Sequence, residues 1–164
     1  MIRKADKNDI DLIRAIALTA FPCTYRNIMS PGQIEYMMEW MYSEQSLASQ
    51  MSSGHTFFIE EGKGYVSYRF DTTLPDGTDV FHLEKLYILP AYQKQGLGKK
   101  LFRTVEEDIR KKTDKGFIIE LNVNRSNPAI GFYRHRGMDI SQTGDFPIGS
   151  GFYMTDYIMS KRYL

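Results

Sequence analysis

The stretch that decides the fold is Leu86–Phe102, LYILPAYQKQGLGKKLF. It starts in the strand-forming run Val80–Leu89, which ends at Pro90, and it enters the regular apolar spacing of a helix at Leu97. The segment Gln93–Lys100, QKQGLGKK, lies between the two. Amides in the first turn of a helix have no intrahelical partner, and glycines let an anion approach the backbone closely. The stretch therefore predicts a phosphate-binding loop between a strand and a helix.

Two better-known phosphate loops do not match this segment. A P-loop reads G-x-x-x-x-G-K-[ST], but position 93 is Gln and position 100 is Lys. A dinucleotide fingerprint reads G-x-G-x-x-G, and its third glycine is replaced by Leu101. The pattern that remains is Q-x-x-G-x-G. Two glycines alone are also compatible with a tight turn that binds nothing.

Working outward from this loop, the chain alternates between helical and strand patterns. We expect one α/β domain, residues 1–164, with a sheet of mixed direction and a parallel strand–helix–strand unit at 80–123. Pro22 should end the first helix, and Ser30 should cap the second. The expected strands are 2–5, 55–60, 64–70, 80–89, 117–123, 137–141 and 152–160; the expected helices are 10–21, 31–42, 43–53, 97–112 and 127–136; and 146–151 is expected to be a loop.

Composition narrows the class of protein. The chain has 42% hydrophobic and 25% charged residues and a formal net charge of +1, which disfavours a nucleic-acid or membrane-surface binder. Its one cysteine cannot form an intrachain disulfide, and the three histidines lack metal-ligand spacing, so we predict no metal site. The charged N-terminus has no signal-peptide core, and no apolar run is long enough for a bilayer, so we expect a cytoplasmic protein.

Two segments together resemble a known family. Leu86–Phe102 is similar to the cofactor motif of the GCN5-related N-acetyltransferase (GNAT) superfamily, a strand and turn followed by [QR]-x-x-G-x-[GA] and a helix. Leu121–Gly137, LNVNRSNPAIGFYRHRG, resembles its second motif, N-x-x-A-x-x-F-Y-x-x-x-G. The order of elements extends the resemblance to nearly the whole chain. A looser likeness points to the polyamine acetyltransferases of the PaiA type.

The resemblance implies a GNAT-like, mostly antiparallel sheet whose central parallel strands splay to admit coenzyme A. It also implies acetyl-CoA as the acetyl donor, with no metal, and an amine of a small molecule or peptide as the acceptor. A homodimer is expected by analogy alone. The residues expected to bind the cofactor are Leu86, Tyr87, Ile88, Gln93, Gln95, Gly96, Leu97, Gly98, Lys99, Lys100, Asn127 and Tyr133.

Three residues are candidates for proton transfer. Tyr133 is our candidate for the general acid at the leaving thiol, because a phenol carries its proton at neutral pH. Glu84 is the first candidate for the base and His82 the second, since their spacing of two places them on one face of a strand. The alternative is that Tyr133 packs a helix and that the other two belong to an ordinary polar strand face.

The acceptor is not readable from the sequence. A polyamine site needs converging carboxylates, and Glu35, Glu39, Glu44 and Glu84 are candidates, although helix glutamates usually face solvent. The aromatic and methionine-rich residues of the second helix are interpreted mainly as helix core. A non-catalytic acyl-CoA sensor on the same fold is the competing hypothesis. A nucleotide-dependent kinase or dehydrogenase is disfavoured by the missing motif residues.

Overall fold

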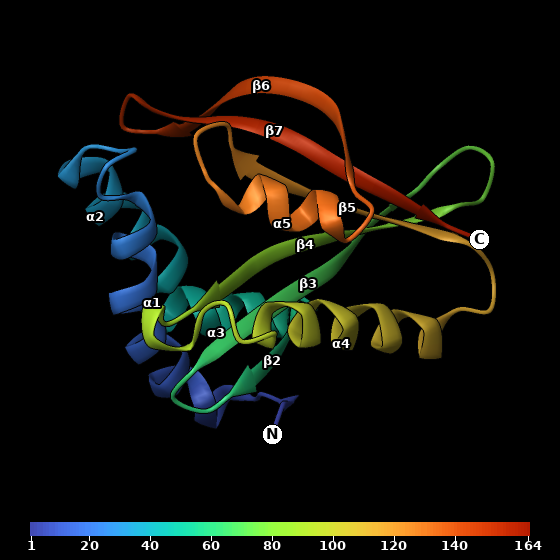
Figure 1. Ribbon diagram of the computed structural model, residues 1–164, viewed down its shortest axis with the longest axis horizontal. Helices are drawn as coiled ribbons and strands as arrows, with labels where there is room; N and C mark the ends of the chain where they lie inside the picture. Colours follow the sequence, from blue (N-terminus) through green and yellow to red (C-terminus); the bar gives the residue numbers. More distant parts are fainter. The chain divides into compact units, whose positions relative to one another are not determined.

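The computed structural model describes residues 1–164 and contains a seven-stranded sheet in the order β1-β2-β3-β4-β5-β7-β6 (Figure 1). Strand β4 runs parallel to β5, whereas β1–β2, β2–β3, β5–β7 and β6–β7 pair antiparallel. The expected α/β class and the mostly antiparallel sheet are therefore confirmed. The elements are β1 Arg3–Lys4, α1 Ile10–Tyr25, α2 Pro31–Tyr42, α3 Glu44–Ser52, β2 Thr56–Glu60, β3 Gly64–Thr73, β4 Asp79–Ile88, α4 Leu97–Lys112, β5 Phe117–Asn124, α5 Ala129–His135, β6 Asp139–Gly149 and β7 Phe152–Tyr163.

The chain divides into two compact units, and β3 and β4 each contribute to both. The first unit consists of residues 1–69 and 84–114, and the second of residues 70–83 and 115–164. Two short 3₁₀ helices, Lys7–Asp9 and Pro90–Tyr92, belong to the first unit.

In the first unit, the helices are anchored by apolar stripes and by caps. Ser30 accepts a hydrogen bond from the amide of Gln33, and Pro31 occupies the first helical position, as predicted. The buried stripe of α4 consists of residues at helical spacing, and α4 runs alongside β3 in Figure 1. The Tyr68 hydroxyl of β3 donates to the Asp108 carboxylate of α4, which joins that helix to the sheet. The stripe residues are Leu97, Leu101, Phe102, Val105 and Ile109.

In the second unit, β5 is the central strand. Its buried residues Phe117, Ile119, Leu121 and Val123 alternate with less buried ones, so that one face is apolar and the other carries polar side chains. It pairs with β7 along its whole length, and β6 forms a long hairpin with β7 (Figure 1).

Two expectations about chain breaks are wrong. Pro22 does not end α1, which continues to Tyr25. Proline removes only its own amide donor, and the following turn is still closed by the bond from the Arg26 amide to the Pro22 carbonyl, at 2.8 Å.

The segment Phe146–Gly151 is not a loop throughout. Residues 146–149 extend β6, and Phe146 and Pro147 lie opposite Met154 and Tyr153 of β7. Proline has no amide hydrogen to donate to a neighbouring strand. It is tolerated at position 147 because β6 is an edge strand, with a neighbouring strand on one side only. The turn itself is confined to Ser150 and Gly151, both with positive φ.

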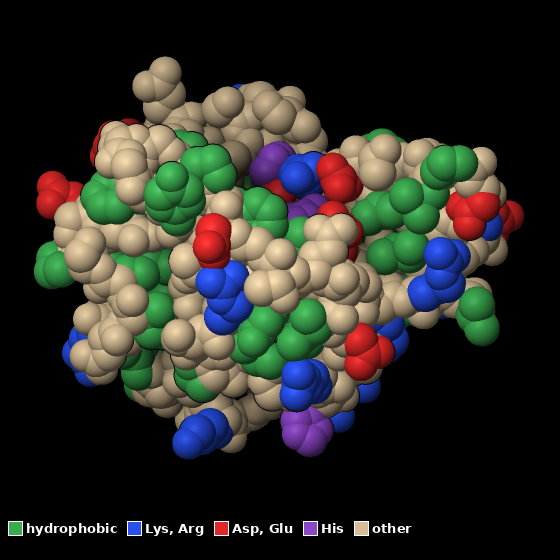
Figure 2. All heavy atoms as spheres, turned by 90° about the horizontal axis from the view of Figure 1, so that it is seen from above, with side chains coloured by type: hydrophobic (Ala, Val, Ile, Leu, Met, Phe, Trp, Pro, Cys, Tyr) green, Lys and Arg blue, Asp and Glu red, His purple; other side chains and the backbone are tan.

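The longest helices, α1 and α4, have 16 residues each, and none of the helices combines the length and apolar character needed to span a bilayer. On the face shown in Figure 2, hydrophobic, acidic and basic side chains are interspersed, in keeping with the formal net charge of +1.

Candidate functional site

The glycine loop before α4 has the geometry of an anion cradle. Gly96 is the N-cap residue of α4 and has a left-handed backbone, with φ of 85°. No side chain caps the helix there, so the amides of its first turn have no capping partner from a side chain. A Cβ atom at Gly96 would meet nothing within 4 Å. This open N-terminus, with Lys99 and Lys100 exposed beside it, fits a pyrophosphate.

The two glutamines of the loop brace its backbone. Gln93 donates from Nε2 to the Ile88 carbonyl at 3.0 Å, and Gln95 donates to the Ala91 carbonyl at 3.1 Å. Lys94 between them has a positive φ of 61°. These side chains therefore hold the shape of the loop, which leaves anion binding to the backbone amides and the lysines.

The end of β4 supplies the next group of predicted cofactor residues. Pairing between β4 and β5 extends from Asp79–Phe117 only to His82–Glu120, although β4 continues to Ile88. Leu86, Tyr87 and Ile88 lie beyond that ladder and are half-buried. Their backbone groups are therefore not used by β5, which is the condition that a pantetheine arm would need to add its own amide hydrogen bonds.

The second predicted motif forms the turn from β5 into α5. The side chain of Asn127 accepts a hydrogen bond from the Ala129 amide at 2.9 Å and so fixes the start of the helix. Tyr133 is 7% exposed, whereas its neighbour Phe132 is half-buried and lies under the Arg136 guanidinium. Tyr133, not Phe132, is thus the more buried ring of the pair.

The two candidate bases have different partners. The Glu84 carboxylate accepts a hydrogen bond from Arg69 Nε at 2.5 Å, and both side chains are partly exposed. His82 lies 3.5 Å from Glu120, measured from Nδ1 to Oε1. Glu84 is therefore held in a charge-assisted pair, and His82 lies beside a carboxylate that was not among the predicted site residues.

The first unit contains a buried amine, Lys85, that the sequence did not lead us to expect. Lys85 is 5% exposed, and its Nζ donates to Gln50 Oε1 at 2.8 Å. Its ammonium also lies over the rings of Tyr42 and Phe57, and burial lowers its pKa to about 8. The sequence did contain a sign of this burial. Lys85 is two residues from Leu83 and two from Tyr87 in LEKLY, and side chains two apart on a strand point to the same face.

Tyrosine hydroxyls pair beside this lysine's strand. Tyr25 and Tyr87 lie 2.9 Å apart through their hydroxyl oxygens, and Tyr65 donates to Tyr42 at 2.6 Å. Burial raises the pKa of Tyr42 and of Tyr65 well above the usual value. These pairs join α1 and α2 to β3 and β4 within the first unit.

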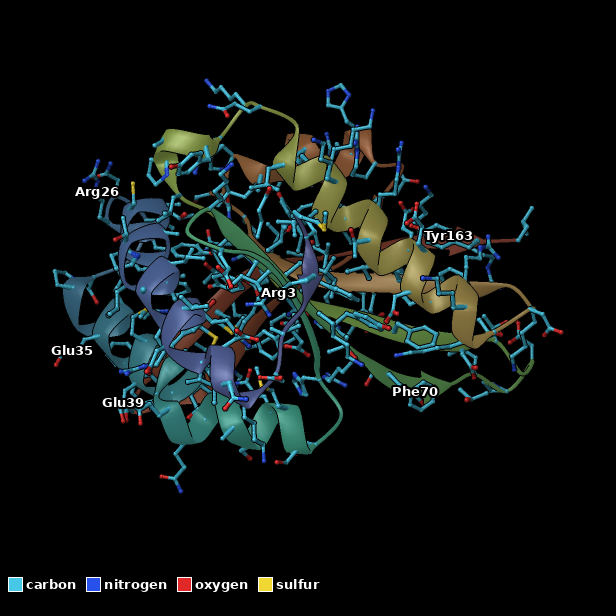
Figure 3. All side chains as sticks on the ribbon, turned by 90° about the horizontal axis from the view of Figure 1, so that it is seen from below. Arg3, Arg26, Glu35, Glu39, Phe70 and Tyr163 are labelled. Atoms are coloured by element: carbon cyan, nitrogen blue, oxygen red, sulfur yellow. The ribbon has the colours of Figure 1, made fainter.

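The helix residues proposed for the acceptor have mixed positions. Met37 and Tyr42 are buried core residues, as interpreted, but Trp40 is 47% exposed and stacks on Tyr36. Figure 3 shows Glu35 and Glu39 directed outward from α2. Both glutamates are exposed, as is usual for glutamates on a helix surface.

One further carboxylate is buried in the second unit. Asp156 of β7 is 1% exposed, and its Oδ2 accepts a hydrogen bond from Asn122 at 3.2 Å. Burial raises its pKa above the usual aspartate value. A buried carboxyl group of this kind is a candidate for proton transfer on the polar side of β5 and β7.

The fold and the loop together define an α/β protein with a glycine loop and an uncapped helix N-terminus after the central parallel strand, where an anion could bind. Comparison with known proteins narrows this class. Residues 18–138 match the model of the acetyltransferase (GNAT) family. The chain therefore belongs to the GNAT family and is an N-acetyltransferase.

Similar proteins are aligned over nearly the whole chain. An uncharacterized N-acetyltransferase encoded in the pepI 3′ region of Lactobacillus delbrueckii is 26% identical, over 98% of this chain and 95% of the relative. The spermidine N(1)-acetyltransferase of Thermoplasma acidophilum is 25% identical, over 99% and 96%. The fold is similar to that of the Thermoplasma acidophilum PaiA N-acetyltransferase in complex with coenzyme A, with a TM-score of 0.81 and 24% identity over 99% and 98% of the two chains.

Proposed function

We propose that this protein transfers the acetyl group of acetyl-CoA directly to a primary amine of a small molecule, with a polyamine as the first candidate. The family match over residues 18–138 carries the transfer chemistry. The polyamine is supported by the name of one relative, spermidine N(1)-acetyltransferase, and by the fold similarity to a PaiA N-acetyltransferase in complex with coenzyme A.

The proposed donor site uses backbone more than side chains. The first-turn amides of α4 and the exposed Lys99 and Lys100 would hold the pyrophosphate. The half-buried backbone of Leu86–Ile88 would pair with the pantetheine amides. When bound, acetyl-CoA supplies an acetyl thioester that is activated towards an amine. Asn127 and Tyr133, from the second motif, are proposed as further cofactor contacts.

Two proton transfers must accompany the reaction. An alkylammonium has a pKa near ~10.4, so the acceptor must lose a proton before its nitrogen can attack. Glu84 and His82 on β4 are the proposed proton acceptors, directly or through water. Tyr133 is proposed to donate a proton to the departing thiolate. A phenol has an ordinary pKa of about 10 and can therefore supply a proton at neutral pH, and Tyr133 is 7% exposed.

Turnover with a panel of amines tests the proposal. Free thiol release from acetyl-CoA should be observed with spermidine and be slower with amino acids, aminoglycosides and peptide N-termini. Tight acetyl-CoA binding without turnover on any of these amines would instead identify a sensor. Turnover restricted to peptide N-termini would retain the enzyme and overturn the polyamine as its acceptor.

Tyr133→Phe tests the acid. The substitution removes one oxygen and keeps the ring, so turnover should fall by about 10²- to 10⁴-fold, the usual contribution of acid–base catalysis. Acetyl-CoA affinity should change little. Tyr163→Phe is a matched control, because that ring stacks on Phe117 at 4.5 Å and has no proposed role in catalysis. Equal turnover in wild type and Tyr133→Phe would make Tyr133 a packing residue.

A further inference from the structure

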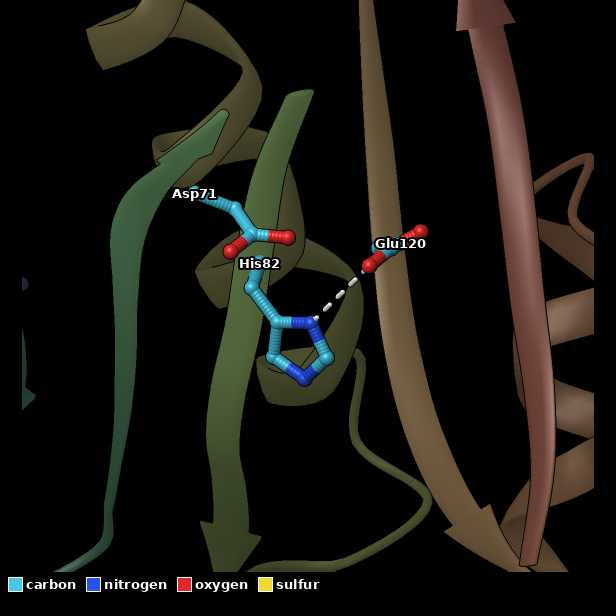
Figure 4. Close-up of side chains that lie close together, drawn as sticks. All are labelled: Asp71, His82 and Glu120. Carbon is cyan, nitrogen blue, oxygen red and sulfur yellow. Dashed lines mark ion pairs between the residues drawn. The ribbon is translucent and has the colours of Figure 1, made fainter. Parts of the chain in front are cut away.

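Three metal-ligating side chains converge on the sheet of the second unit. They come from three neighbouring strands: Asp71 from β3, His82 from β4 and Glu120 from β5. One ligand atom from each lies within 4.8 Å of the other two. Figure 4 shows the two carboxylates on the same side of the imidazole as its Nδ1 atom.

The strands fix these positions. His82 and Glu120 are direct partners in the parallel ladder of β4 and β5, where their pairing ends. Their side chains are 12% and 29% exposed, so both are held against the sheet, while Asp71 is exposed. Ligands on adjacent strands are more rigidly positioned than ligands on a loop, and the exposed side leaves access for an ion and water.

The contact between His82 and Glu120 is a long one. His82 Nδ1 and Glu120 Oε1 are 3.5 Å apart, longer than a normal charge-assisted hydrogen bond of about 2.7–2.9 Å. The carboxyl groups of Asp71 and Glu120 also lie close to each other and to the same imidazole. A divalent cation would reduce their repulsion and take the nitrogen lone pair and both oxygens.

The donor types select the ion. Imidazole nitrogen with carboxylate oxygen is the donor set of open zinc sites, whereas magnesium and calcium prefer oxygen alone. Around a tetrahedral zinc with bonds of about 2.0–2.1 Å, ligand atoms are about 3.4 Å apart. The largest separation must therefore close by about 1.4 Å, which rotation of the carboxylates can supply.

We propose that Asp71, His82 and Glu120 form a binding site for zinc or a similar divalent transition-metal ion, with water completing the coordination. The three residues of this site are not among those proposed to bind the acetyl donor, and the ion is not proposed as a cofactor of acetyl transfer. Because it takes the imidazole nitrogen, zinc is expected to inhibit any step in which His82 accepts a proton; this consequence rests on the proposed function.

Zinc titration of the chelator-treated full chain, in competition with a chromophoric zinc indicator, tests the site. Wild type should bind one equivalent, and His82→Gln and Glu120→Gln should each bind at least about tenfold more weakly, because each loses a ligand. His135→Gln is the matched control, since His135 is exposed on α5 and should leave affinity unchanged. Far-UV circular dichroism confirms that each variant is folded.

Cobalt provides a second readout. Bound Co²⁺ in wild type should give the intense visible absorption of a four-coordinate ion, and His82→Gln should lose it. Absence of stoichiometric zinc binding in wild type, or equal affinity in wild type, His82→Gln and Glu120→Gln, would overturn the site. Because both readouts are metal binding, they are independent of whether the amine panel shows turnover.

Discussion

Burial of Lys85 is expected to make the folding stability of this protein rise with pH between about pH 8 and pH 10. Its pKa is lowered from 10.5 to about 8 because burial disfavours the charged ammonium. Between these two pKa values the unfolded chain binds more protons at this residue than the folded protein, so folding stability rises with pH. Below about pH 8 both states are protonated, and the folded state carries the full cost of the buried charge.

The magnitude follows from the two pKa values. A difference of about 2.5 pKa units corresponds to about 3.4 kcal/mol in total. The linkage relation gives a gain of about 1.3 kcal/mol between pH 7 and pH 9, and about 2 kcal/mol by pH 9.5. The range should stop there, because unfolded tyrosines begin to ionise near pH 10 and then favour unfolding.

Lys85→Met isolates this effect. The methionine side chain fills a similar apolar space but cannot titrate. The measured quantity is the free energy of unfolding of wild type minus that of the variant. It should rise by about 1.3 kcal/mol from pH 7 to pH 9 and by about 2 kcal/mol from pH 7 to pH 9.5. Urea unfolding followed by far-UV circular dichroism measures both proteins at each pH. Lys111→Met, an exposed site on α4, is the control and should show a constant difference. A wild-type minus Lys85→Met difference that stays constant within about 0.5 kcal/mol would refute the reasoning, since a buried titrating amine must produce a slope.

Three other substitutions have defined outcomes. Gly98→Leu should weaken acetyl-CoA binding, measured by calorimetry, at least about tenfold, because the side chain would block the approach of the pyrophosphate. The substitution should not unfold α4, since leucine is favoured over glycine in a helix by about 0.8 kcal/mol. Intact affinity would contradict the pyrophosphate assignment. Gly64→Ala places a Cβ atom 2.9 Å from the Tyr87 carbonyl oxygen and should lower the free energy of unfolding, measured in urea, by about 1–3 kcal/mol. An unchanged urea midpoint would show that β4 can move away from the added methyl group without loss of stability. Asp9→Asn should cost about 1–2 kcal/mol at pH 7, a range discounted because Arg3 is partly exposed. Most of this loss should disappear as pH falls from about 4 to 2, since Arg3 holds the pKa of Asp9 at about 2. An undiminished difference at pH 2 would point to lost packing.

Local patterns were enough to predict most of the elements. The strand ending at Pro90, the helix Leu97–Lys112 and the cap at Ser30 depend on residues within a few positions of each other, and the structure agrees with them. Pro22 and the segment Phe146–Gly151 were predicted wrongly. In both places proline or glycine indicated the end of an element. The element continues because its remaining backbone hydrogen bonds, within α1 and between β6 and β7, are still made.

The sequence by itself determined the family and predicted a phosphate loop, because an anion cradle needs glycines and free amides at consecutive positions of one turn. Only the tertiary structure decided which polar side chains meet. Asp71, His82 and Glu120 are far apart along the chain and converge through strand pairing, and Lys85 is buried because a helix covers its strand. The proton affinity of such groups depends on burial and on neighbours from other strands, which spacing along the chain does not encode.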